Sequence, residues 1–96
     1  MAQKHFVVVA YDISDDRRRT RLHNLLEDYG TPAQYSVFEC LVTEKQMAQL
    51  QRRVRAKIKV TEDSVRYYHL CENCRAKIET TQAAKEIHQE VAAIIV

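Results

Sequence analysis

The chain carries the sequence HFVVVAYDI at residues 5–13, an almost unbroken run of β-branched and aromatic side chains. Such a run is typical of a central strand that is covered on both faces, or on one face and by a dimer contact. Residues 14–16 follow with side-chain oxygens for an N-cap and acids for a first turn, so we expect a helix to begin near Asp15. Gly30, in the position of a left-handed cap, and Pro32 predict its end. The apolar stripe of this helix is Leu22, Leu25, Leu26 and Tyr29.

Residues 33–42 again favour extended structure. We expect a short strand up to Gln34, a kink at residues 35–36 and a longer strand from Val37.

Thr43 and Gln46 have the spacing of a capping box and predict the start of a second helix. Its apolar stripe is Met47, Leu50, Val54 and Ile58. Residues 64–70 alternate between the two faces of a half-buried strand, and residues 76–80 are compatible with a short last strand.

This order of elements predicts an α+β fold, a ferredoxin-like βαββαβ sandwich with an extra C-terminal strand. We expect residues 1–80 to form the domain and residues 81–96 to form a tail that docks on a dimer mate or another partner. Within the tail, residues 83–90 favour a helix and residues 91–96 an extended, apolar segment that needs a cover. A domain of 96 residues is modestly stable alone, so a homodimer that enlarges its core is expected.

Composition narrows the class of protein. With 46% hydrophobic and 29% charged residues, the chain resembles an ordinary globular domain. It has no apolar run of about 20 residues, so no membrane span is expected, and its start lacks the pattern of a signal peptide. Three cysteines, an odd number, favour reduced thiols in a cytoplasm. The net charge of +2 is small, but two basic clusters suggest a polyanionic partner, with solvated helix faces as the alternative. The clusters are Arg17, Arg18, Arg19 and Arg21, and Arg52, Arg53, Arg55, Lys57 and Lys59.

Asp12 lies at the carboxyl end of the first predicted strand, where open α/β sheets commonly bind ligands. One carboxylate holds Mg²⁺ poorly, because this ion prefers several oxygen ligands and retains waters. Two copies of Asp12 across a dimer axis could share one ion, which would activate water or orient a phosphodiester. The alternative is that Asp12 only helps to cap the helix that follows.

The first basic cluster stands in the first turns of a helix, where cations oppose the helix macrodipole. Helix amino ends and arginine forks both bind phosphate, which gives the cluster a functional reason. From their spacing to Leu22, we expect Arg18 and Arg19 to lean toward the rim of the sheet, and Arg17 and Arg21 to point outward.

Cys71 and Cys74 form a C-x-x-C motif, which supplies half of a zinc site. His69, Cys40 or a dimer-related pair could complete such a site. A redox pair would be expected at a helix start after a strand, in a fold of thioredoxin type, so we favour a turn between two strands with reduced thiols.

Three segments together strongly resemble the CRISPR-associated Cas-two family: YDISDDRRR at residues 11–19, LLEDYG at 25–30 and QYSVFEC at 34–40. The resemblance implies a ferredoxin-like protomer in a homodimer, with the last strand completing the sheet of its partner. In some members it implies a metal-dependent phosphodiesterase active on single-stranded RNA or double-stranded DNA. More generally, it implies an adaptor that joins the CRISPR integrase to capture and insert spacer DNA.

Carried onto this sequence, the resemblance places the functional aspartate and metal ligand on Asp12, with Mg²⁺ as the cofactor, and the helix arginines on Arg19 and Arg21. The Ser-Val-Phe motif falls on residues 36–38. Pro32 stands where many members have an arginine, which puts nuclease activity in doubt more than the fold. The nucleic-acid contacts expected from residues and resemblance together are Tyr11, Arg17, Arg18, Arg19, Arg21, Ser36 and Phe38.

Three functions follow as hypotheses. The first is a Mg²⁺-dependent endonuclease that uses Asp12, Arg19 and Arg21. The second is a non-catalytic dimeric adaptor that holds duplex DNA by its backbone for the integrase. The third and weakest is a metal chaperone that uses Cys71 and Cys74.

Overall fold

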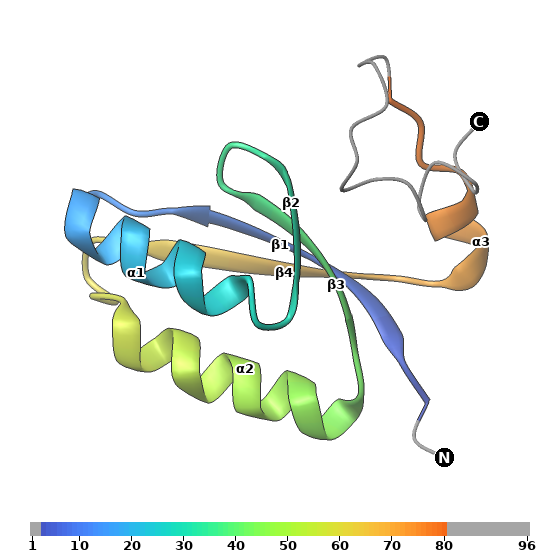
Figure 1. The fold of residues 1–96 in the computed structure, drawn as a ribbon, viewed down its shortest axis with the longest axis horizontal. Helices are drawn as coiled ribbons and strands as arrows, with labels where there is room; N and C mark the ends of the chain where they lie inside the picture. Colours follow the sequence, from blue (N-terminus) through green and yellow to red (C-terminus); the bar gives the residue numbers. More distant parts are fainter. Residues whose placement is uncertain (1–2, 81–96) are drawn as a thin grey trace.

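The computed structural model describes residues 3–80 and shows an α/β sandwich of two layers (Figure 1). One antiparallel sheet has the strand order β2-β3-β1-β4, and α1 and α2 pack on the same face of it. The first six elements follow the predicted order and confirm the ferredoxin-like βαββαβ arrangement. The elements are β1 (His5–Asp12), α1 (Asp16–Leu26), β2 (Gly30–Gln34), β3 (Val37–Val42), α2 (Glu44–Lys57), β4 (Ser64–Leu70) and α3 (Glu72–Ala76).

The core lies between the sheet and the two long helices. In β1, Val7, Val9 and Tyr11 alternate toward the helices and are buried. The predicted helix stripes are confirmed, because their leucine, methionine and valine residues are all buried, and each large apolar side chain contributes about 1.5–3 kcal/mol. The buried helix residues are Leu22, Leu25, Leu26, Met47, Leu50 and Val54, and Tyr29 and Ile58 pack against them while partly buried.

Both predicted helix caps are present. The side chain of Asp15 accepts a hydrogen bond from the backbone N–H of Arg18 at 2.9 Å. At the start of α2, the Thr43 hydroxyl accepts from the Gln46 N–H at 3.1 Å, and the Gln46 side chain accepts from the Thr43 N–H at 2.8 Å. These bonds satisfy donors that the first turn of a helix leaves without partners, so both helices begin where the sequence predicts.

The prediction for Gly30 is wrong. Helix α1 ends at Leu26 with Glu27 as a right-handed cap, and Gly30 is the first residue of β2, without a positive φ. Glycine is needed there for close approach, because a Cβ atom would lie 2.2 Å from the carbonyl oxygen of Glu39 in β3. Pro32 lies within β2, an edge strand, where a missing N–H is tolerated.

The predicted kink at residues 35–36 is confirmed as the tight turn that joins β2 to β3. Ser36 has a φ of 59°, in the left-handed region, and its carbonyl oxygen accepts a hydrogen bond from the Tyr11 N–H at 3.0 Å. The turn is thereby tied to the end of β1, next to Asp12.

The predicted strand at residues 76–80 is wrong. Cys71 is the N-cap of α3, and residues 77–80 form no strand. Figure 1 shows α3 beyond the carboxyl end of β4, away from α1 and α2. The expected extra C-terminal strand and the tail at residues 81–96 lie outside the described residues. Within residues 3–80, no helix is long and apolar enough to cross a membrane.

Candidate nucleic-acid interface

Asp12 is exposed at the carboxyl end of β1, directly opposite Ser64 at the start of β4. Strand alternation places it on the same face as Val8 and Ala10, the face turned away from the helices. The helix that follows is capped by Asp15, so the alternative role of Asp12 as a cap is wrong. Its carboxylate therefore stands at the rim of the open face of the sheet.

The open face carries apolar side chains in its centre, with Glu39 opposite Val8 and Arg66 opposite Ala10. Val8 and Ala10 are half-buried there, and Leu41 of β3 and Tyr68 of β4 are 40% and 47% exposed. The register places Phe6 opposite Leu41 and Val8 opposite Tyr68, so these side chains share one face. A sheet normally buries its apolar face against another layer.

Arg18 is engaged inside the protein. Its Nε donates to Asp63 at 2.8 Å and its terminal nitrogen to Glu62 at 3.2 Å, which leaves its side chain 22% exposed. The bonds to Asp63 raise the pKa of Arg18. Arg18 leans toward the sheet as predicted, but its predicted phosphate contact is not supported, because its Nε and one terminal nitrogen are already bonded to these acids.

Asp63, which the sequence analysis did not select, has a fully buried side chain. Besides Arg18, it accepts hydrogen bonds from the backbone N–H groups of Lys59 at 2.8 Å and Ser14 at 3.2 Å. Its hydrogen bond with the Arg18 guanidinium, together with these amides, holds its pKa well below the usual range. Asp63 thereby joins the segment before α1 to the segment before β4, on both sides of Asp12. Its role depends on this pairing, which no local pattern in the sequence reveals.

Arg19 is held beside the turn at residues 35–36. Its guanidinium donates to the carbonyl oxygen of Ile13 at 2.9 Å and forms an ion pair with Asp16. It borders a pocket of about 280 Å³ next to Tyr35, whose side chain is 99% exposed. This pocket brings together three of the predicted site residues, Tyr11, Arg19 and Ser36, and its other lining residues are Thr20, His23, Gln34 and Tyr35.

Arg17 and Arg21 lie four residues apart on one exposed face of α1, as predicted. Neither forms an ion pair with another residue of the described segment, in contrast to Arg18 and Arg19. They are therefore the arginines of this cluster whose charge is best placed to meet a phosphate backbone.

Phe38 is completely buried and has no surface to offer a nucleic acid, so its predicted contact is corrected to a role in packing. Its ring lies 6.5 Å from that of Tyr11 and 5.0 Å from that of His23, edge to face. Tyr11 is largely buried as well, and this burial raises its pKa. The two rings pack at the end of β1 on the helix side of the sheet. Only the part of Tyr11 that lines the pocket remains accessible.

The residues present limit how a metal ion could be held. Within residues 3–80 there is no group of three or more His, Cys, Asp or Glu side chains arranged for a metal ion. Asp12 supplies one hard oxygen donor at an exposed position, which suits Mg²⁺ with most of its waters retained. The donor set fits a shared ion between two copies of Asp12 and does not fit a site within one protomer.

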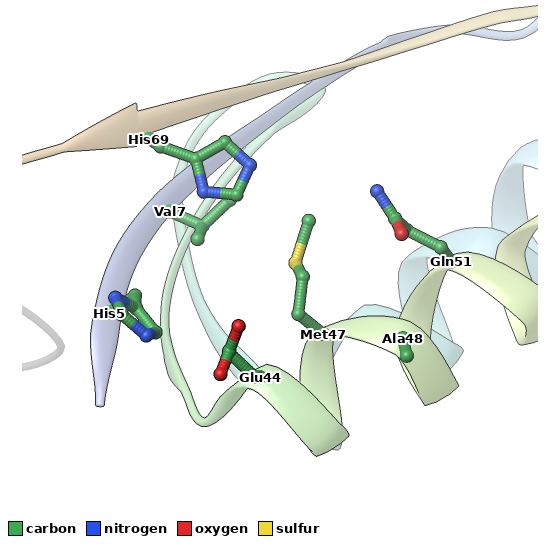
Figure 2. A pocket seen from close by; sticks show the side chains of 7 residues that line it. All are labelled: His5, Val7, Glu44, Met47, Ala48, Gln51 and His69. Atoms are coloured by element: carbon green, nitrogen blue, oxygen red, sulfur yellow. The ribbon is translucent and has the colours of Figure 1, made fainter. Parts of the chain in front are cut away.

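Two other features lie apart from Asp12. Of the second basic cluster, Arg53 is paired with Asp28 at 3.2 Å and lies over the ring of Tyr29. A pocket of about 340 Å³ lies between α2 and the opposite end of the sheet. His5 and His69 are among its lining residues (Figure 2). Since His5 begins β1 and Asp12 ends it, about 23 Å of extended strand separates this pocket from the rim.

Known proteins resemble this chain over most of the described segment. The model of the family described as CRISPR associated protein Cas2 matches residues 5–78. A protein of Synechocystis, named CRISPR-associated endoribonuclease Cas2 3, is 51% identical over 63 residues, which cover 66% of this chain and 68% of that protein.

Solved structures agree with the sequence matches. Cas2 of Streptococcus pyogenes, determined at pH 6.5, aligns with a TM-score of 0.73 and 33% identity over 80% of this chain and 99% of that one. A chain of a complex described as a partial Cas6-RT-Cas1–Cas2 complex aligns with a TM-score of 0.70 and 28% identity, over 80% of this chain and 84% of that chain.

Proposed function

The chain belongs to the CRISPR-associated protein Cas2 family, and from that premise we propose that it acts as a homodimeric, Mg²⁺-dependent endonuclease on single-stranded RNA or double-stranded DNA. The endoribonuclease name of the Synechocystis relative supports a nuclease. The observation that carries the proposal is the position of Asp12, an exposed carboxylate at the rim of a sheet face with exposed Leu41 and Tyr68 that a second copy would cover.

In this proposal, Asp12 and its copy in the second protomer hold the ion. Bound there, Mg²⁺ supplies a water activated for attack on phosphorus and neutralises charge on the phosphodiester. Arg21, exposed on α1, binds a phosphate oxygen and stabilises the charge that develops in the transition state. Arg19 is held by Ile13 and Asp16 beside the turn, so it arrives with its orientation already fixed.

Asp63 and Arg18 act at a distance from the substrate. Their bonds fix the segments on either side of Asp12, so the carboxylate does not have to be ordered when the substrate binds. They are positioning residues in this proposal, and their removal is expected to affect stability as well as activity.

The test is cleavage of labelled single-stranded RNA and duplex DNA by the full chain with Mg²⁺ or EDTA. The wild type is expected to cleave with Mg²⁺ and not with EDTA. Asp12→Asn, which keeps the shape of the side chain without its charge, is expected not to cleave. Asp28→Asn, an exposed acid elsewhere on the surface, is the matched control and should cut like the wild type. Unchanged cleavage by Asp12→Asn would assign the activity to other residues or to a contaminant.

A second candidate is a non-catalytic adaptor in spacer acquisition. The structural likeness to a chain of a Cas1–Cas2 complex favours it. Here Arg17 and Arg21 of both protomers hold a DNA duplex by its backbone, without reading its sequence, and the tail at residues 81–96 docks the Cas1 integrase.

Spacer insertion in the presence of the integrase separates the two candidates. If the adaptor role is sufficient, Asp12→Asn supports insertion at the wild-type level, whereas Arg17→Gln combined with Arg21→Gln loses it. Loss of insertion in Asp12→Asn, with the dimer intact, would show that the carboxylate is needed for more than assembly.

A further inference from the structure

Cys71 and Cys74 form a local pair of thiols that the proposed function does not use. Both are exposed, and the backbone N–H of Cys74 donates to the sulfur of Cys71 at 3.4 Å. Cys71 directly follows β4 and caps α3, so the predicted turn between two strands is wrong and the cysteines instead occupy a strand-to-helix junction. A helix start after a strand is one of the two features expected of a redox C-x-x-C motif; the other, a fold of thioredoxin type, is not the fold of residues 3–80.

The two thiols differ in chemical character. Hydrogen bonds from the backbone N–H and the thiol of Cys74 lower the pKa of Cys71, whereas the same thiol contact raises the pKa of Cys74. A thiolate attacks a disulfide and a thiol does not, so Cys71 has the character of the attacking group and Cys74 that of the resolving group.

Cys40 provides an internal contrast. It is buried in the core, and burial raises its pKa to about 11. Its sulfur is therefore both inaccessible and protonated at neutral pH, and it should not react under conditions in which the exposed pair does.

A zinc site is a weaker explanation of the pair. Zinc requires four ligands in a structural site, and no third His, Cys, Asp or Glu of the segment 3–80 joins the two thiols in a metal-binding group. His69, the ligand considered from the sequence, lines the pocket of Figure 2 together with Met47 and Val7.

We propose that Cys71 and Cys74 form a reversible dithiol–disulfide pair that exchanges with low-molecular-weight disulfides such as oxidised glutathione. The Cys71 thiolate attacks one sulfur of the small disulfide, which forms a mixed disulfide and releases one small thiolate. Cys74 then loses its proton and attacks the sulfur of Cys71, which closes the intramolecular disulfide and releases the second small thiolate. Two protein thiols are oxidised and one small disulfide is reduced to two thiols.

The pair lies next to a contact on the open face of the sheet. Arg75, adjacent to Cys74, places its guanidinium 4.8 Å from the centre of the Phe6 ring, and Phe6 lies at the beginning of that face. A closed disulfide would fix the turn that carries Arg75. The oxidation state of the pair would therefore affect the contact between Arg75 and Phe6, at the edge of the face proposed to form the dimer.

The test uses the full-length protein, titrated with mixtures of oxidised and reduced glutathione and analysed by peptide mass spectrometry. The peptide that contains Cys71 and Cys74 should lose two hydrogens, and Cys40 should stay reduced. In Cys74→Ser, Cys71 should be trapped as a mixed disulfide, at a higher rate than Cys74 in Cys71→Ser, because the backbone hydrogen bond to the Cys71 sulfur remains. Zinc in the purified protein is measured before the titration.

Three results would overturn the proposal. The first is the absence of an intramolecular disulfide in strongly oxidising glutathione. The second is equal trapping rates for the two serine variants. The third is stoichiometric zinc that protects both thiols from oxidation, which would assign the pair to a metal site completed elsewhere. The first and third of these results can be measured on the wild-type protein, without any variant.

Discussion

The arginines of α1 offer a quantitative test of nucleic-acid binding. Arg17 and Arg21 are exposed and form no ion pair within the described segment, while Arg18 is engaged by Asp63 and Arg19 by Asp16. Replacing Arg17 and Arg21 together by Gln removes two charges and breaks none of the ion pairs found among residues 3–80. The expected consequence is weaker binding to duplex DNA with a smaller dependence on salt.

The size of the effect follows from counterion release. Each arginine that neutralises one phosphate of B-DNA contributes about 0.9 to the slope of log K against log salt. Two arginines from each protomer of the proposed dimer give a change in slope of about 3.6. Between 50 and 200 mM salt, the wild type should therefore lose roughly a hundredfold more affinity than the double variant.

The assay is the affinity for a fluorescent DNA duplex, measured by anisotropy over this range of salt. The matched control combines Arg52→Gln and Arg55→Gln, two exposed arginines of α2, so that the same charge is lost from another surface. The control should keep most of the wild-type slope. A wild-type slope in the α1 variant, or an equal loss in both variants, would refute the assignment of the interface to α1.

Three single substitutions test the elements that hold the rim. The pKa of Asp63 is lowered in the folded state, so its carboxylate stabilises the protein above about pH 4 and this contribution is lost as the pH falls. Asp63→Asn should therefore have a lower Tm than the wild type at pH 7 and a smaller fall in Tm between pH 7 and pH 3. An unchanged dependence of Tm on pH would count against the buried ion pair. Gly30→Ala places a Cβ against the backbone of β3 and should lower the free energy of unfolding by about 3 kcal/mol, which corresponds to a fall in Tm of more than about 10 °C. The control Thr31→Ala should change the free energy of unfolding little. Tyr68→Glu should weaken the homodimer in analytical ultracentrifugation and Tyr35→Glu should not, since Tyr35 lies on the turn outside the open face; equal dissociation of both would argue for another interface.

Periodicity and capping were sufficient to predict most of the fold. The run at residues 5–13, the leucine stripe of α1 and the capping box at Thr43 are local signals, and each was found where it was expected. Local signals succeed here because the spacing of side chains along one element decides which face of it is buried.

Two errors of the sequence analysis have different physical causes. Gly30 was interpreted as a helix cap because the sequence does not show that β3 passes within 2.2 Å of its missing Cβ. Residues 71–76 were expected to form a turn and then a strand, yet Cys71 caps a short helix. At Gly30 the close approach of β3 decided between a cap and a strand, whereas at residues 71–76 a local hydrogen bond from the Cys74 N–H to the Cys71 sulfur caps the helix that forms.

The candidate site was predicted in part. Asp12 and the outward direction of Arg17 and Arg21 followed from strand alternation and helix spacing. The capture of Arg18 by Asp63 did not, because it depends on a contact across 45 positions of sequence. A cluster of arginines in a sequence therefore predicts a basic surface, but not which of its members are available to a ligand.

The central claim is that two protomers meet through their open sheet faces and bring both Asp12 carboxylates to one ion. The most direct measurement is an anomalous difference map of crystals of the full chain grown with Mn²⁺ in place of Mg²⁺. We expect a single peak on the twofold axis, contacted by Asp12 of each protomer. Carboxylates on opposite surfaces of the dimer, or Mn²⁺ bound at other residues, would contradict the claim.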